Sequence, residues 1–141
     1  MNRPAIVDTN VVAAGLLTSD EKAPTARILD LMLAGSLRFL LSIELLAEYR
    51  DVLLRPKIAR SHGLTASEVD KVLAALAFLA TVREIGPLPA GRAPCGDEHL
   101  VALLAVDPRA VLITGDRALA RQVGARALAP REFLARLFDE T

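Results

Sequence analysis

Short apolar runs alternate with longer segments of helical periodicity along this chain, without a repeat of fixed period. The run Val111, Leu112, Ile113 and Thr114 is typical of a strand that is buried in a parallel sheet. Strands that alternate with helices in this way are typical of α/β domains. The alternation therefore predicts an α/β domain with a mainly parallel sheet.

Capping and turn residues set the expected boundaries of these elements. Ser42 is placed to cap a helix, and Thr65 with Glu68 has the spacing of a capping box. Pro56 is expected to end the helix before it, and residues 86–96 to form a loop rich in Pro and Gly. The expected strands cover residues 5–8, 37–41, 82–85, 111–114 and 126–128. The expected helices cover residues 10–17, 24–34, 43–55, 65–80, 97–107 and 116–124, with a last helix from 130.

Composition limits the class of protein. With 141 residues, 52% of them hydrophobic and 24% charged, residues 1–141 are expected to form a single domain that is neither disordered nor spans a bilayer. Basic and acidic residues both number 17, which argues against a polybasic coat for nucleic acid. Aromatic residues make up only 4% and Trp is absent, so any nucleic acid is expected to be bound through its phosphates and not by base stacking.

Two features predict the compartment. Cys95 is the only cysteine, so the chain forms no intrachain disulfide. Residues 1–4 lead directly into a strand-like segment instead of the extended apolar core of a signal peptide. We therefore expect a cytoplasmic protein that does not associate with membranes.

Four acidic residues follow the expected strands, at the ends where parallel sheets bind ligands. They are Asp8, Glu48, Asp97 and Asp116. Glu48 lies six residues beyond Ser42, a rise of about 9 Å along its helix, so its side chain can lean over the rim of the sheet. All four acids are expected at one edge of the sheet.

Each of these acids also has an ordinary structural explanation. The three aspartates lie at turns or helix starts, where an Asp cap is worth about 1 kcal/mol, and Glu48 could be a solvated helix residue. Four like charges at one rim repel one another, however, and a divalent cation would relieve that repulsion. Because all-oxygen ligands favour Mg²⁺ or Mn²⁺, the pattern predicts a metal site.

Three further residues are weaker candidates for the same site. Asn10 could cap the first helix, its more frequent role, or orient Asp8 through a hydrogen bond. Thr114 could be an ordinary strand residue, or its hydroxyl could face the turn that follows. Glu98, beside the third acid, is a reserve ligand.

Four motifs contain the four acids. They are Val7-Asp8-Thr9-Asn10, the stretch from Ser42 to Glu48, Asp97-Glu98-His99-Leu100, and Ile113-Thr114-Gly115-Asp116-Arg117. The order and spacing of these motifs resemble the PIN-domain family over nearly the whole chain. The resemblance implies a three-layer α/β/α sandwich around a central, mainly parallel sheet of four to five strands. It also implies a ribonuclease that depends on Mg²⁺ or Mn²⁺, with Asp8, Glu48, Asp97 and Asp116 as catalytic metal ligands.

The resemblance further implies the partners. Many such proteins are VapC-like toxins of toxin–antitoxin pairs, which implies an RNA substrate, a cognate antitoxin and a homodimer. Cations are needed beside an acidic site to hold RNA, although the same residues also suit solvated helix ends. The candidates for RNA binding are Arg50, Arg55, Lys57, Arg60 and Arg117.

One segment departs from the family pattern and motivates an alternative hypothesis. In the branch that this chain most resembles, aspartates cluster before the third acid, whereas residues 93–97 read Ala-Pro-Cys-Gly-Asp. The alternative is a non-catalytic PIN-like module that binds RNA or a protein. A thiol nucleophile made from Cys95 and His99 is disfavoured because no third group evidently orients the histidine. A phosphatase of the haloacid-dehalogenase type is disfavoured because Asn10 stands where a second Asp would be expected.

Overall fold

All strand pairs are parallel in the computed structural model, which describes residues 3–87 and 97–139. The strands are β1 (Ala5–Val7), β2 (Leu40–Leu41), β3 (Thr81–Val82), β4 (Val111–Ile113) and β5 (Ala127–Leu128). They form a three-stranded sheet of order β1-β4-β5 and a pair β2-β3. A parallel bridge between Ala5 and Phe39 joins the two groups, which gives the order β3-β2-β1-β4-β5.

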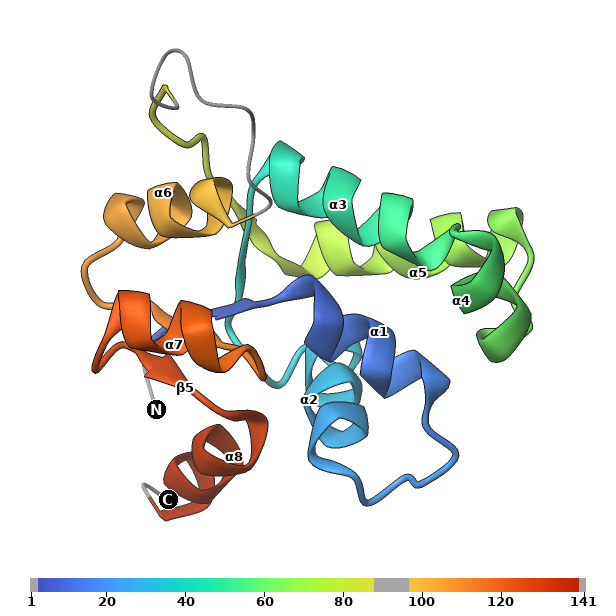
Figure 1. The fold of residues 1–141 in the computed structure, drawn as a ribbon, viewed down its shortest axis with the longest axis horizontal. Coiled ribbons are helices and arrows are strands. Elements are labelled where there is room, and N and C mark those ends of the chain that lie inside the picture. Colours follow the sequence, from blue (N-terminus) through green and yellow to red (C-terminus); the bar gives the residue numbers. More distant parts are fainter. Residues whose placement is uncertain (1–2, 88–96, 140–141) are drawn as a thin grey trace.

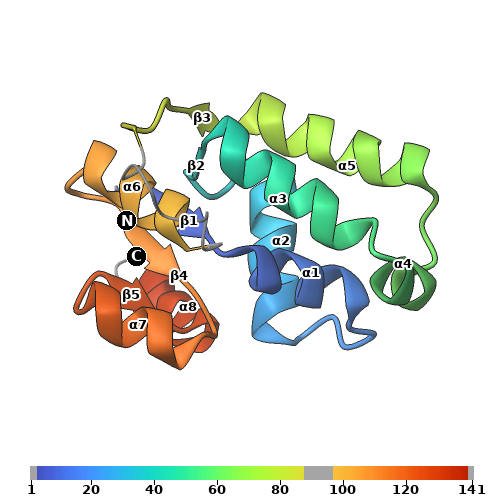
Figure 2. The same cartoon turned by 45° about the horizontal axis from the view of Figure 1, so that its top comes forward.

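Helices lie on both sides of these strands (Figure 1). They are α1 (Thr9–Leu17), α2 (Pro24–Leu33), α3 (Ile43–Leu53), α4 (Pro56–His62), α5 (Ala66–Leu79), α6 (Glu98–Val106), α7 (Arg117–Val123) and α8 (Pro130–Asp139). Helix α6 packs against β1 and α8 packs against β5, while α1, α2, α3 and α5 pack on one another (Figure 2). The expected α/β fold with a mainly parallel sheet is confirmed. Within residues 3–87 and 97–139, every helix is too short or too polar to cross a membrane.

Local signals fix several of these boundaries. The Ser42 hydroxyl accepts a hydrogen bond from the Leu45 amide at 3.0 Å and so caps α3. Thr65 and Glu68 form the predicted capping box at the start of α5. Gly63 ends α4 with a φ of 71°, a left-handed conformation that glycine adopts without strain.

The core is built around the two central strands. Every residue of β1 and β4 is buried, and the largest fully buried side chains around them include Phe39, Tyr49 and Phe133. Burying each such large side chain contributes about 1.5–3 kcal/mol. The ends of β1 and β4 are therefore a rigid support for the residues that follow them.

The structure differs from the predicted elements in one helix and two strands. Residues 56–62 form a separate helix, α4, because Pro56 occupies its first turn, where the missing amide costs no hydrogen bond. The strand predicted at 37–41 ends at Leu41 as expected but begins only at Leu40, after a bend at residue 37, and the strand predicted at 82–85 is the short, exposed edge strand β3. Most of the loop predicted at 86–96 lies outside the described residues.

Candidate active site

The strand order reverses between β1 and β4, and open parallel sheets bind ligands at the carboxyl ends of the strands at such a point. From β1 the chain proceeds to β2 and β3 on one side, and then returns to β4 and β5 on the other. Asp8 directly follows β1, Thr114 directly follows β4, and Asp116 lies two residues further on. Residues that are distant in sequence therefore meet at this edge.

Hydrogen bonds through one hydroxyl join the two strand ends. The Thr114 hydroxyl donates to Asp8 Oδ2 at 2.7 Å, and its oxygen accepts from the Asp116 amide at 3.0 Å. Asp8 is 5% exposed and Thr114 is 2% exposed. Thr114 therefore fixes the orientation of a buried carboxylate and the start of the next turn at the same time.

Helix capping explains one of the three aspartates and not the other two. Asp116 caps α7, because its Oδ1 accepts from the amides of Ala118 and Leu119 at 2.9 and 3.1 Å. Asp8 and Asp97 occupy the N-cap positions of α1 and α6, but neither side chain makes a cap hydrogen bond. Helix capping therefore does not explain the positions of these two carboxylates.

Burial and mutual repulsion raise the pKa of two acids. Burial is the largest cause of the raised pKa of Asp8, the charges of Asp97 and Glu48 add to it, and the hydrogen bond from Thr114 opposes it. Burial also raises the pKa of Asp97, followed by the charges of Asp116 and Glu48. The four acids predicted at this edge therefore lie close enough for their charges to interact.

Glu48 reaches this edge from α3. The next residue, Tyr49, anchors that helix. Tyr49 is fully buried and its hydroxyl donates to the carbonyl of Val7, the last residue of β1. Burial raises the pKa of Tyr49 well above its usual value, and the charges of Asp8 and Glu48 add to this shift. The tyrosine therefore stays a hydrogen-bond donor and ties α3 to the end of β1.

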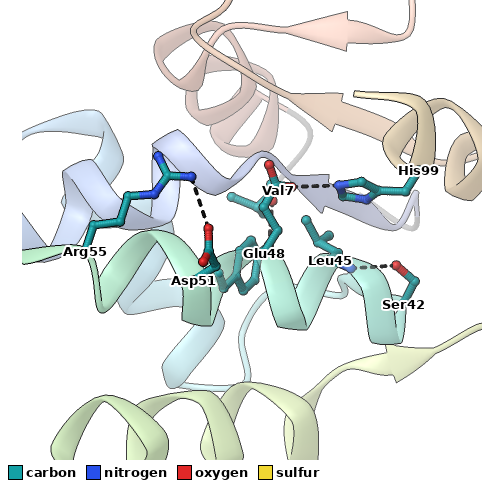
Figure 3. Close-up of polar contacts among 8 residues, drawn as sticks. Val7, Ser42, Leu45, Glu48, Asp51, Arg55 and His99 are labelled. Atoms are coloured by element: carbon teal, nitrogen blue, oxygen red, sulfur yellow. Dashed lines mark hydrogen bonds and ion pairs between the residues drawn. The ribbon is translucent and has the colours of Figure 1, made fainter. Parts of the chain in front are cut away.

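The Glu48 carboxylate is itself held by His99 of α6. Glu48 Oε2 lies 2.7 Å from His99 Nε2, and Figure 3 shows the two side chains pointing toward one another. His99 is 9% exposed and lies in the first turn of α6, two residues after Asp97. The expectation that no third group orients this histidine is therefore wrong. Cys95, its imagined partner, lies outside the described residues.

The contact between Glu48 and His99 is not apparent from the sequence, because it joins residues 51 positions apart. Its only local signal is the run Asp97-Glu98-His99 at a helix start, which places a histidine one residue beyond two acids that were considered as ligands. Such a run is informative only when the helix is known to face the same edge as Glu48.

Asn10 and Glu98, two of the three weaker candidates, lie at the starts of α1 and α6. Asn10 is the second residue of α1 and is exposed, so its expected capping role is wrong: the N-cap is Asp8. Within residues 3–87 and 97–139, no hydrogen bond joins Asn10 to Asp8. Glu98 is the first residue of α6 and is half-buried beside Asp97.

The candidate RNA-binding cations are spread over several faces. Arg50 lies about 200° around α3 from Glu48, where its Nε contacts Asp70 Oδ1 of α5 at 2.8 Å. Arg55 contacts Asp51 at 3.1 Å, on the same face of α3 as Glu48 (Figure 3). The remaining cations are exposed, two on α4 and one at the start of α7: Lys57, Arg60 and Arg117. Arg50 is therefore separated from the acids by its own helix.

The carboxylate oxygens of the acids are suitable ligands for a hard divalent cation, but the side chains are not gathered closely around one point. Within the described ranges 3–87 and 97–139, no three His, Cys, Asp or Glu side chains are close enough to hold an ion together. Burial is the main cause of the raised pKa of Asp8 and Asp97, but repulsion among the acids adds to it, and a cation would relieve that repulsion. Mg²⁺ usually keeps several waters and binds through one or two carboxylates, so these residues fit such an ion.

Comparison with known proteins shows which family the chain resembles. A family model described as a PIN domain matches residues 4–118, which include both central strands and all four acids. No curated protein matches the chain. PIN domains are generally nucleases that use divalent metal ions, in keeping with the acidic edge. The chain belongs to the PIN-domain family.

Proposed function

We propose that this protein is a metal-dependent endoribonuclease that hydrolyses phosphodiester bonds of RNA. The observation that supports the proposal best is the buried Asp8 carboxylate, which Thr114 orients at the point where the strand order reverses. A buried carboxylate whose pKa is raised by burial and by neighbouring acids is costly for stability, and such groups concentrate at functional sites.

Each acid has a proposed role. Asp8, Asp97 and Asp116 would hold Mg²⁺ or Mn²⁺, directly or through water, and Glu98 stands beside them in reserve. When bound, such a cation polarises a phosphodiester oxygen and lowers the pKa of a water molecule. Glu48 would complete the ligand set, or orient the attacking water and accept its proton.

Hydrolysis adds water across the bond between phosphorus and the 3′ oxygen. The water oxygen bonds to phosphorus as the 3′ oxygen leaves and takes up a proton, which yields a 5′-phosphate and a 3′-hydroxyl. Arg55, Lys57, Arg60 and Arg117 are exposed and would hold RNA phosphates around the acidic edge, with Arg50 further away. Because these contacts are ionic, RNA binding should weaken as salt rises.

The test is incubation of the purified protein with a mixed RNA pool and Mg²⁺ or Mn²⁺, followed by mapping of the cut ends. We expect 5′-phosphate ends that disappear when EDTA is added or when Asp8→Asn is introduced. Asp30→Asn is the matched control, because this aspartate is exposed on α2 and belongs to neither the acidic edge nor the candidate RNA-binding residues. RNA that is bound but not cut, with no stabilisation of the protein by Mn²⁺, would favour the non-catalytic binding module instead.

We further propose that the protein is the toxin of a toxin–antitoxin pair. It would then act on cytoplasmic RNA as a homodimer and be neutralised by a cognate antitoxin protein. Induced expression should arrest growth, and Asp116→Asn should be harmless at the same protein level. Equal toxicity of the two would reject the catalytic explanation.

A further inference from the structure

The contact between Glu48 and His99 is partly shielded from solvent. The Glu48 side chain is 28% exposed and the His99 side chain 11%, and their Oε2 and Nε2 atoms lie 2.7 Å apart. An ionised carboxylate only accepts hydrogen bonds, so Nε2 of His99 carries a proton and donates a hydrogen bond to Glu48. The bond engages Oε2 and leaves Oε1 outside the contact.

His99 uses one ring nitrogen, unlike the other histidine of the chain. Within the described residues its Nδ1 is buried without a hydrogen-bond partner. In His62, by contrast, Nε2 contacts the Leu53 carbonyl at 2.8 Å and Nδ1 accepts from the Leu64 amide at 2.9 Å. His62 therefore serves the packing of its own segment, whereas the hydrogen bond of His99 goes to a carboxylate of another helix.

We propose that His99 is a positioning residue that holds the Glu48 carboxylate at the acidic edge. A glutamate side chain has several rotatable bonds, so without this contact it would populate rotamers that point into solvent. The Glu48 carboxylate acts on both Asp8 and Asp97, so its place contributes to the field at the edge. The inference rests on the proposed function, because it states how the Glu48 carboxylate is held in place to bind a cation or to orient the attacking water.

Two substitutions separate positioning from packing. In His99→Gln the amide nitrogen reaches about the place of Nε2, whereas in His99→Asn it reaches only that of Nδ1. We expect His99→Gln to retain most of the Mn²⁺ affinity, measured from the rise in melting temperature with Mn²⁺ alone. His99→Asn should lose about 10–100-fold in Mn²⁺ affinity, and about as much in kcat for RNA with little change in KM. Equal losses in both variants would overturn the proposal.

A spectroscopic test of the contact does not depend on cleavage. Long-range ¹H–¹⁵N spectra of the metal-free protein resolve two histidines, and His62 is the internal control. We expect a proton on Nε2 of His99, and we expect Glu48→Gln to shift the His99 ring signals and not those of His62. Unchanged His99 signals would overturn the proposal even if His99→Asn failed to fold. If the shift and the Mn²⁺ contrast are found but the wild type cuts no RNA, the nuclease proposal fails while the positioning role stands.

Discussion

Two contacts of nearly equal length, each made by a carboxylate, lie on opposite faces of α3. On one face Glu48 Oε2 lies 2.7 Å from His99 Nε2, and on the other Arg50 Nε lies 2.8 Å from Asp70 Oδ1. The side chains of the first pair are 28% and 11% exposed, and those of the second are 53% and 50% exposed. The two contacts therefore differ in their surroundings and not in their geometry.

The surroundings decide what each contact does. At the exposed pair, the hydrogen bond from Arg50 lowers the pKa of Asp70, but water and salt screen the attraction and little net stability results. On the face of the shielded pair, burial raises the pKa of Asp8 and Asp97, and the charges of neighbouring acids add to the shift. One helix thus separates a solvated face from the face that carries the proposed site.

The largest expected difference between the faces is in RNA cleavage. Glu48→Gln keeps the shape of the side chain but removes its charge, so we expect cleavage to fall by more than about 100-fold. Asp70→Asn makes the same chemical change on the other face and should leave cleavage within about twofold. Initial rates on one RNA substrate measure both, and similar losses in the two variants would contradict the assignment of the active face.

A second prediction concerns the residue between the two faces. Tyr49→Phe removes the hydrogen bond to the buried Val7 carbonyl, so the free energy of unfolding should fall by about 1–2 kcal/mol. The melting temperature should then fall by roughly 3–6 °C. Urea denaturation measures the first quantity. An unchanged midpoint would mean that this hydroxyl does not tie α3 to β1.

The third prediction follows from the raised pKa of Asp8. Because the folded pKa lies above the ordinary 3.8, the folded state loses stability as pH rises from about 3.8 through the raised value, and the loss is complete above it. Asp8→Asn keeps an acceptor for Thr114 without the charge, so in metal-free buffer it should melt a few degrees higher at neutral pH. The gain should shrink toward zero as pH falls to about 3.8. A gain that is constant with pH would show that the charge is not its cause.

The smallest effect is expected at the exposed pair. Arg50→Gln should change the melting temperature by about 1 °C or less, because both partners are solvated. Any effect should vanish in about 1 M NaCl, where the Debye length is about 3 Å. A larger shift that survives salt would mean that the two faces of α3 are less different than their exposure indicates.

Features that depend on neighbours in sequence were predictable. The Ser42 cap, the capping box at Thr65 and the buried strand β4 each have a local signal, and the structure confirms them. Helix α4 was missed because Pro56 both ends one helix and suits the first turn of the next. The sequence pattern alone does not choose between these two effects.

The candidate site was predictable as an edge and not as a set of contacts. The rule for parallel sheets brings Asp8 and Asp116 to one edge, and the structure shows the acids close enough to interact. The pairs Glu48–His99 and Arg50–Asp70 depend on how α3 packs against α6 and α5, which no local pattern encodes. The single-residue bridge between the two groups of strands is likewise a tertiary feature.

Glu48, Tyr49 and Arg50 are consecutive, and each serves a different side of α3. Removing one residue between Ser42 and Glu48 would turn the rest of the helix by about 100° relative to its cap. The acid would then rotate away from the sheet edge and the tyrosine away from its carbonyl, with no change in overall composition. Insertions and deletions in this stretch are therefore expected to be far more damaging than substitutions, because the number of residues between the cap and the acid sets the direction in which the acid points.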